Sequence, residues 1–458
     1  MKKIIIIIIA VLILGGGAFI YFGKSKVDPV TGETTNGFKS FFSSGNTSSD
    51  KSANPNDMGG EVLPNDTGTI DQSLVDSSAK LKQVTDFAVA GLATFMDTRP
   101  IAEVLNAPTT DTKATEEIKT EEPIVPDTKA PVKKVDPKAK TTKVIAPVVE
   151  LPKVDIVPAL RFVARSNGHI YEQYLDTLAS GKISNTTIPT IHEAIFAKEG
   201  QFVMYRYLNQ VEETIQSFFG TLGGAESGAF LPDNIASVSV APSGSQFFYL
   251  VPIGNDIAGY IGSFTDSKKT QIFTSAFTEW TPQWAQPNTI FMTTKPSYLF
   301  AGSVYSLNKL TNGFTKIFGG VKGLTTLASS YNNLILYTDT SNGTPALGLY
   351  NITTHVSSPL GINTITDKCV WSSNGIDIYC AVPNDIPNGK YPDSWYQGLV
   401  SFNDSIIKID SLNLSSTTVI DTSDTSALDA VNLTLSPDEK TLFMINKKDS
   451  TLWSLDLN

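Results

Sequence analysis

The sequence contains few of the residues on which most metal sites, cross-linked scaffolds and acid–base catalysts depend. Its 458 residues include two cysteines and three histidines, which excludes a disulfide-rich scaffold and most thiolate metal sites. Lys and Arg number 35 against 45 Asp and Glu, a formal net charge of −10, and this balance argues against nucleic-acid binding. The acids Asp421, Asp424 and Asp429 show no metal-ligand spacing, and we interpret them as solvated loop charges. We therefore expect no catalytic residue, cofactor or metal site that the sequence alone could identify.

Long apolar runs are also scarce, and the exception lies at residues 4–22, between lysines. As a helix with ~1.5 Å per residue it spans roughly 28 Å, close to the hydrocarbon thickness of a bilayer. No small-x-small cleavage site follows it, which favours an uncleaved transmembrane anchor over a secretory signal peptide. Only three residues precede the apolar segment, and we expect the large domain that follows it to lie outside the cytoplasm. Because the numbers of lysines on the two sides of the segment differ little, a cytoplasmic location of this domain is the alternative.

Two regions are poor in large apolar residues and are predicted to be disordered. Residues 23–79 are rich in Ser, Thr, Asn, Asp and Gly and predict a tether. Residues 97–158 mix regularly spaced prolines with lysines and glutamates, which is typical of an extended linker.

From residue 159 to 458 short β-rich runs alternate with polar turns, which predicts an all-β domain. Units that begin near residues 191, 235, 277, 321, 363 and 427 repeat a pattern of strand, tight polar turn and strand. A period of ~42 residues with about four strands per unit is typical of a β-propeller. The turns, best seen at Ser436-Pro437-Asp438 with Glu439 in the glycine place, resemble those of TolB-like and WD40-like propeller repeats. The passage at residues 161–189 is also similar to uncharacterised, membrane-anchored propeller proteins, a resemblance that implies no chemistry.

Strand counting predicts how the ring closes. Three strands precede the first full unit and three end the chain, so two strands are missing from seven four-stranded blades. Residues 80–96 supply both: Leu81–Thr85 would complete the last blade, and Val89–Phe95 would begin the first. The alternative is a short helix at residues 81–95 and a six-bladed ring.

Strand parity then assigns the connections to two faces. The longest insertion relative to the repeat is Pro383–Ser405, which lies between a second and a third strand. It contains Tyr391, Asp393, Trp395 and Tyr396, and Tyr298 lies in the equivalent connection of another unit. Aromatic and polar residues on a rigid scaffold are typical of recognition surfaces. We predict that these five residues contact a partner; alternatively, Trp395 only pins its own loop to the ring. Deleting the loop is expected to leave the ring folded.

Cys369 and Cys380 form a pair across a predicted hairpin. If the turn is at Asn374-Gly375, the two residues are directly opposite each other, at a separation that a disulfide accepts. Two buried thiols are the alternative, and a disulfide would favour an oxidising location.

Three functions are compatible with these features. The first is a membrane-tethered, extracytoplasmic propeller that acts as a non-enzymatic binding or scaffold module for an envelope protein, a peptide or a glycan. The second is an enzyme, such as a lyase or a glycan hydrolase, that uses the central funnel, although fold alone is weak support. The third is a regulatory subunit of a membrane complex.

Overall fold

The computed structural model describes residues 26–27, 34–35, 80–100, 154–197, 199–222, 228–423 and 428–458. The chain divides into two compact units, residues 1–97 with 157–458 and residues 98–156. The predicted transmembrane segment at residues 4–22 lies outside the described residues, as does the tether apart from the paired strands β1 (Lys26–Val27) and β2 (Thr34–Thr35). Within the ranges just given, no helix combines the length and the apolar character that crossing a membrane requires.

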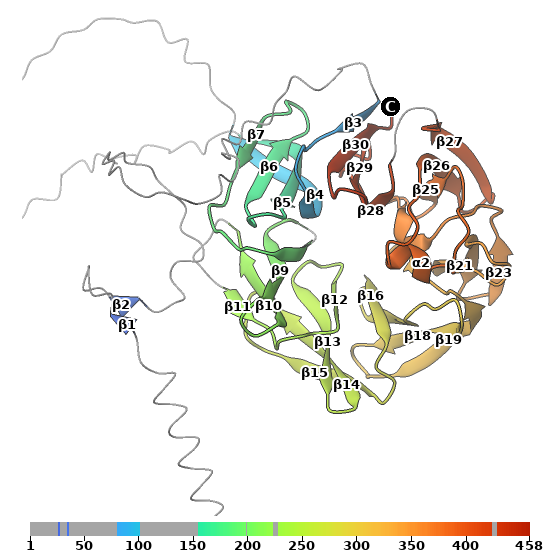
Figure 1. Cartoon of the computed structure of the whole chain (residues 1–458), viewed down its shortest axis with the longest axis horizontal. Helices are drawn as coiled ribbons and strands as arrows, with labels where there is room; N and C mark the ends of the chain where they lie inside the picture. The colour runs from blue at the N-terminus through green and yellow to red at the C-terminus, as the bar shows by residue number, and fades with distance from the viewer. Residues whose placement is uncertain are drawn as a thin grey trace, which may run out of the picture. The chain divides into compact units, whose positions relative to one another are not determined.

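Seven four-stranded antiparallel sheets form a closed ring, which Figure 1 shows end on. Their strand order confirms the predicted seven-bladed β-propeller, and the six-bladed alternative is wrong. The strands of blades 1 to 3 are β4 (Val89–Pro100), β5 (Val154–Ala164), β6 (Ile170–Tyr174), β7 (Ser180–Lys182), β8 (Ile191–Phe196), β9 (Phe202–Asn209), β10 (Thr214–Thr221), β11 (Gly228–Phe230), β12 (Ser237–Val240), β13 (Gln246–Ile253), β14 (Asp256–Ser263) and β15 (Thr270–Ser275).

Blades 4 to 7 continue the pattern, with the first strand of each nearest the axis. Their strands are β16 (Trp280–Gln286), β17 (Thr289–Thr294), β18 (Ala301–Asn308), β19 (Phe314–Lys322), β20 (Thr326–Ala328), β21 (Leu334–Asp339), β22 (Ala346–Asn351), β23 (Val356–Pro359), β24 (Cys369–Trp371), β25 (Asp377–Pro383), β26 (Asp404–Asp410), β27 (Ser415–Ile420), β28 (Ala430–Leu435), β29 (Thr441–Asn446), β30 (Leu452–Asp456) and β3 (Leu81–Gln83).

The last blade takes its outer strand from the beginning of the chain. Strand β3 pairs antiparallel with β30, and Leu81 is the register partner of Leu455. The next segment, β4, is the innermost strand of blade 1. The ring is therefore closed by hydrogen bonds between segments from opposite ends of the sequence, which leaves no open edge at the joint.

Strand structure also extends into the range 97–158, where the sequence predicted a disordered linker. Strand β4 continues to Pro100 and β5 begins at Val154, and the two are neighbours in one sheet. Within the unit of residues 98–156, Arg99 Nη2 lies 3.4 Å from Asp155 Oδ2. The strands extend further than the sequence predicted because two adjacent extended segments satisfy each other's backbone groups even where their side chains are exposed. Residues 101–153 lie outside the described part.

Apolar side chains pack between the blades. Seven clusters each join two neighbouring sheets, and together they account for every blade boundary of the ring. Both faces of a sheet are apolar where consecutive apolar residues point alternately to its two sides: in β13, Phe247 and Tyr249 pack toward blade 2, and Phe248 and Leu250 pack toward blade 4. Each blade is thus stabilised by both of its neighbours.

Side-chain hydrogen bonds cross the same boundaries. Each bond joins a side chain of one blade, or of the connection that leads to it, to the backbone of an adjacent blade or of its connection. The seven pairs are Arg161–Gly200, Arg206–Ile235, Ser239–Trp284, Gln283–Thr326, Asn332–Gly375, Lys368–Ala430 and Thr94–Leu435. Hydrogen bonds depend on direction, whereas apolar contacts do not. These bonds therefore restrict the alignment of adjacent sheets more strictly than apolar packing alone.

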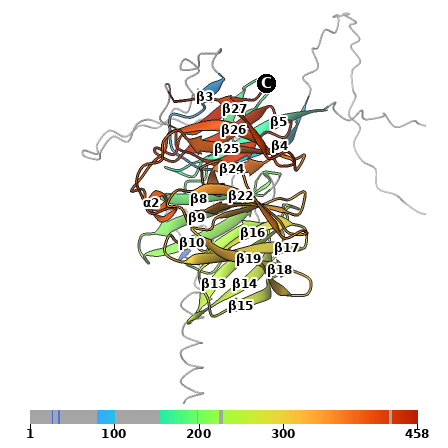
Figure 2. The same ribbon diagram turned by 90° about the vertical axis from the view of Figure 1, so that its right-hand side faces the viewer.

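We name the two faces of the ring by their connections. The loop face carries the connections between second and third strands and those between blades, and the turn face carries the others. The 3₁₀-helix η2 (Thr366–Lys368) and the short helix α2 (Asp393–Tyr396) belong to connections of the loop face. In the side view of Figure 2, α2 lies at one face of the ring.

Candidate functional site

The long connection between β25 and β26 folds as a packed layer on the loop face. Four of the side chains around it are fully buried in a cluster of their own: Ile365, Tyr391, Trp395 and Phe402. The Tyr391 and Trp395 rings stack on Phe402, with centroids 5.9 and 6.2 Å away. This connection, residues 384–403, therefore has a small hydrophobic core, and we call it the blade-6 loop.

A buried ion cluster lies beneath this loop. The Lys368 ammonium group lies 2.7 Å from Asp404 Oδ2 and 2.6 Å from Asp429 Oδ1, and none of the three side chains has any exposed surface. Lys368 Nζ also donates a hydrogen bond of 2.9 Å to the Ala430 carbonyl. All three donors of the ammonium group are thus satisfied, as a buried charge requires.

Asp429 connects the ion cluster to the loop. Its carboxylate accepts hydrogen bonds from Trp395 Nε1 at 3.2 Å, from Ser401 Oγ at 3.0 Å and from the Phe402 backbone N–H at 3.0 Å. Burial acts to raise the pKa of Asp429, but the charge of Lys368 and these donors outweigh it and hold the pKa below its usual value. The sequence interpretation of Asp429 as a solvated charge was wrong, because the folded loop covers it.

Asp404 has a different environment within the same cluster. Its Oδ2 accepts the Ala430 N–H at 2.6 Å, whereas its Oδ1 is buried without a partner among the described residues. Burial raises the pKa of Asp404 to about 6, although Lys368 acts in the opposite direction. As the pH falls, Asp404 is therefore the first carboxylate of the cluster to be protonated.

The predicted contact residues fall into two groups. Tyr391 and Trp395 each retain 2% of their exposure, and the hydroxyl of Tyr391 donates to the Pro387 carbonyl at 2.5 Å. These two aromatic side chains hold the loop on the ring, which agrees with the alternative role stated for Trp395. Tyr396, by contrast, remains 44% exposed, and its hydroxyl donates to Asp367 Oδ2 at 2.8 Å.

The other two predicted residues join loops of different blades. Asp393 Oδ2 accepts a hydrogen bond of 2.7 Å from the backbone N–H of Tyr298, in the connection between β17 and β18. Lys390 Nζ lies 4.8 Å from the centroid of the Tyr298 ring. Hydrogen bonding to Tyr298 raises the pKa of Lys390. The structure thus brings Tyr298 and Asp393 together, as neighbours of Tyr396 in one loop cluster.

Sequence reasoning missed the aliphatic and aromatic residues that these loops expose. Leu299 and Phe300 are 58% and 73% exposed beside Tyr298, and Leu399 is 72% exposed after α2. Exposed apolar residues that gather on one surface are typical of interaction sites. Their spacing in the sequence carried no signal, because loop residues have no regular periodicity.

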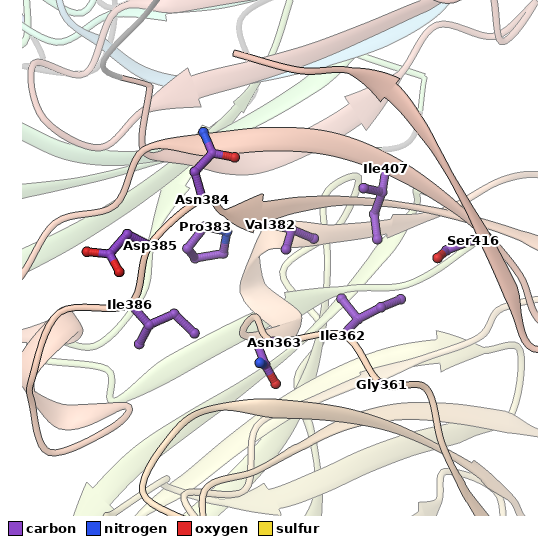
Figure 3. Close-up of a pocket in the computed structure, with 10 residues that line it drawn as sticks. All are labelled: Gly361, Ile362, Asn363, Val382, Pro383, Asn384, Asp385, Ile386, Ile407 and Ser416. Atoms are coloured by element: carbon purple, nitrogen blue, oxygen red, sulfur yellow. The ribbon is translucent and has the colours of Figure 1, made fainter. Parts of the chain in front are cut away.

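A cleft of about 480 Å³ opens at the base of the loop. Its lining residues come from the segment after β23, from the end of β25 with the residues that follow, and from β26 and β27; Figure 3 shows them: Gly361, Ile362, Asn363, Val382, Pro383, Asn384, Asp385, Ile386, Ile407 and Ser416. Five of the ten are apolar, but most of the surface that the cleft exposes is polar.

A disulfide joins the first two strands of blade 6. Cys369 of β24 and Cys380 of β25 are register partners, with a Cα–Cα distance of 4.1 Å and an S–S bond. Both side chains are buried within the cluster that joins blades 5 and 6. The bond therefore cross-links the sheet that carries the blade-6 loop.

No group of three or more His, Cys, Asp or Glu side chains with a metal-binding arrangement occurs among the described residues. The three histidines lie on different blades, with His169 in blade 1, His192 in blade 2 and His355 in blade 5.

No protein-family model and no curated protein matches the chain. Among solved structures, an oligogalacturonate lyase from Vibrio parahaemolyticus is 9% identical, with a TM-score of 0.48 over 66% of this chain and 86% of the lyase. TolB from Acinetobacter baumannii is 12% identical, with a TM-score of 0.38 over 66% of this chain and 76% of TolB. The Swd1 β-propeller domain of Myceliophteria thermophila is 8% identical, with a TM-score of 0.42 over 66% of this chain and 94% of the Swd1 domain. At these identities a likeness says nothing of this chain's ligand.

Proposed function

We propose that this chain is a non-enzymatic binding module that captures a peptide segment of a partner protein on its loop face. The recognition surface consists of Tyr396 and Leu399 on the blade-6 loop, with Leu299 and Phe300 on the neighbouring loop. The single observation that carries the proposal is that these side chains are exposed on loops that buried contacts hold in one conformation.

The physical reason lies in the cost of ordering a binding site. A mobile loop loses conformational entropy when it binds, and this loss weakens the affinity. Here Asp429 bonds to three groups of the loop, and Asp393 bonds to the next loop. The exposed apolar side chains are thus pre-positioned, and their burial by a partner favours binding.

Selection of a random phage-displayed peptide library on the full-length protein tests this function. We expect enriched peptides whose affinity falls about tenfold or more in the Tyr396→Ala, Leu399→Ser double variant, since hot-spot residues cost more than ~1 kcal/mol each. Leu412→Ser is the matched control, because Leu412 is 69% exposed in blade 6 but lies in a connection of the turn face. Equal loss in the control, or no enrichment, would contradict the proposal. Glycan-array binding that the double variant abolishes would instead assign this surface to a sugar.

We also propose that residues 4–22 anchor the chain and that the propeller lies outside the cytoplasm. The sequence of the anchor and the disulfide between Cys369 and Cys380 support this proposal, since such bonds persist in oxidising compartments. Protease treatment of intact cells should remove the propeller, and a propeller that is cleaved only after lysis would contradict an outside location.

A further inference from the structure

Three cationic side chains meet at the short connection between β29 and β30, on the loop face of blade 7. Lys447 and Lys448 belong to this connection, residues 447–451. Arg165, from the corresponding connection of blade 1, reaches the same turn, because its Nη1 donates a hydrogen bond of 3.1 Å to Ser450 Oγ. Arg165 and Lys448 are exposed, and Lys447 is half-buried. We call these three residues the basic cluster.

No counter-ion accompanies the basic cluster in the part of the chain that the structure describes. None of its three side chains forms an ion pair there. Their hydrogen-bond acceptors are uncharged: Lys447 Nζ donates to the Trp395 carbonyl at 2.9 Å, and Lys448 Nζ donates to Asn403 Oδ1 at 2.6 Å. Each of these bonds uses one of the three donors of an ammonium group, so further donors remain for an anion.

The acid of the same connection does not neutralise the basic cluster. Asp449 Oδ1 accepts the backbone N–H of Thr451 at 2.9 Å and the hydroxyl of Thr451 at 2.7 Å. This carboxylate therefore stabilises its own turn, a common role of aspartate. One acid beside three basic residues leaves the region with a net positive charge, although the whole chain has a formal net charge of −10. The region is thus suited to an anionic partner group.

The ammonium groups are held beside the proposed recognition surface. The carbonyl that accepts the bond from Lys447 belongs to Trp395, the residue before Tyr396, and the rings of Trp395 and Tyr396 have centroids 5.3 Å apart. Lys447 Nζ also lies 4.9 Å from the centroid of the Trp395 ring. Because Lys448 bonds to Asn403 of the same blade-6 loop, both lysines place their charges next to the loop that carries Tyr396.

We infer that the basic cluster binds carboxylate side chains of the captured peptide, so that this peptide carries aspartate or glutamate beside the apolar residues that contact Tyr396 and Leu399. This inference rests on the proposed function, whose partner it specifies. The ion pairs would be solvent-accessible and individually weak. Their main effect is therefore selectivity for acidic over neutral or basic segments.

Binding of short probes to the full-length protein tests the inference without a selected peptide. The probes are the N-acetyl methylamides of the dipeptides Glu-Glu and Gln-Gln, and saturation-transfer NMR measures their affinities. We expect the glutamate probe to bind about fivefold more tightly, as a small number of exposed ion pairs allows. Raising the salt concentration from about 0.05 M to about 0.5 M should remove this difference, since salt screens exposed charges.

Two results with these probes would overturn the inference. The first is equal binding of the glutamate and glutamine probes at low salt. The second is tighter binding of glycerol 3-phosphate than of the glutamate probe, which would assign the basic cluster to a phosphate group.

Variants locate the binding. Lys447→Gln, Lys448→Gln removes two charges but keeps groups that can donate hydrogen bonds, and it should abolish the preference for the glutamate probe. Lys447→Arg, Lys448→Arg keeps the charges and should keep the preference. The matched control is Lys268→Gln, Lys269→Gln, since these adjacent lysines are exposed in the connection between β14 and β15, on the turn face. A preference that persists without Lys447 and Lys448, or that the control abolishes as well, would overturn the inference.

The two proposals fail separately. Library peptides that need Tyr396 and Leu399 but bind the Lys447→Gln, Lys448→Gln variant unchanged would retain the proposed function and remove the basic cluster from it. A preference for the glutamate probe that depends on both lysines, without any enriched peptide, would retain the basic cluster as an anion site and contradict the proposed function.

Discussion

The ammonium group of Lys368 lies 2.7 Å from the carboxylate of Asp404, and both side chains are completely buried. Lys368 ends η2 between blades 5 and 6, whereas Asp404 begins the third strand of blade 6 at the end of the long loop. The ion pair therefore fastens the loop to the inner part of the ring. Deleting residues 383–405 would remove Asp404 and uncover Lys368, so the loop is not separable from the ring as the sequence suggested.

Replacing Lys368 by Met should destabilise the protein strongly. Loss of the ammonium group leaves Asp404 and Asp429 buried without their counter-ion, which costs about 3–5 kcal/mol in comparable cases. Urea denaturation measures this loss. The control is Lys408→Met: Lys408 lies 2.9 Å from Asp377 but is 38% exposed, so we expect a loss below about 1 kcal/mol. Similar losses of unfolding free energy in the two variants would show that the buried cluster stabilises the protein no more than an exposed ion pair does.

Stability should depend on pH through Asp404. Its pKa of about 6 exceeds the value of an unfolded aspartate, so between about pH 4 and pH 6 the folded state binds more protons than the unfolded state. The unfolding free energy therefore decreases as the pH rises through this window, by roughly 2–3 kcal/mol. Asp429 has a lowered pKa and titrates below the window.

The measurement compares the wild type with Asp404→Asn by denaturant unfolding between about pH 4.5 and pH 7. The wild type should gain stability relative to the variant as the pH falls. A constant difference across this range would show that Asp404 has an ordinary pKa.

Glu439 combines a strained backbone with a contact between blades. Its φ is +56°, and its carboxylate accepts hydrogen bonds from Ser372 Oγ at 2.6 Å and from the Ser373 N–H at 2.5 Å in blade 6. Glu439→Ala loses both bonds and keeps the strain, whereas Glu439→Gly loses the bonds and relieves the strain. We expect both variants to be less stable than the wild type, and the alanine variant by about 1 kcal/mol more than the glycine variant. An alanine variant as stable as the glycine variant would contradict strain at this position.

Removing the disulfide should lower stability without opening the ring. Cys369 and Cys380 are 11 residues apart, and closing a loop of this size in the unfolded chain corresponds to about 3 kcal/mol. The Cys369→Ala, Cys380→Ala variant should lose this amount in urea denaturation. Dithiothreitol should lower the unfolding free energy of the wild type to the value of this variant. An unfolding free energy of the wild type that dithiothreitol leaves unchanged would contradict the disulfide.

Much of the fold could be predicted because it depends on local signals. The period of polar turns such as Ser436-Pro437-Asp438 identified the blades, since a tight turn between two short strands needs only neighbouring residues. Strand counting then required two more strands, and β3 and β4 lie where the count placed them. The limits of the strands were less predictable: β5 begins at Val154 because it pairs with β4, although its first three residues are exposed.

The candidate site was predictable only in part. The length of the blade-6 loop and its aromatic residues were evident, but which of them are exposed was not. Trp395 is buried because it packs on Phe402 and bonds to Asp429, 34 residues away. No composition or spacing distinguishes such a tryptophan from one that remains exposed.

The sequence by itself determined the class of fold and the repeated unit, because hydrophobic alternation and turn chemistry act between near neighbours. It favoured seven blades, but only the pairing of β3 with β30 excluded a six-bladed ring. Only the tertiary structure decided which charges are buried and which side chains remain free. Lys368 and Asp429 are 61 residues apart, and their pairing depends on how two blades and a loop pack together. Burial and desolvation are properties of the assembled structure, so no local pattern in the sequence reveals which charges they affect.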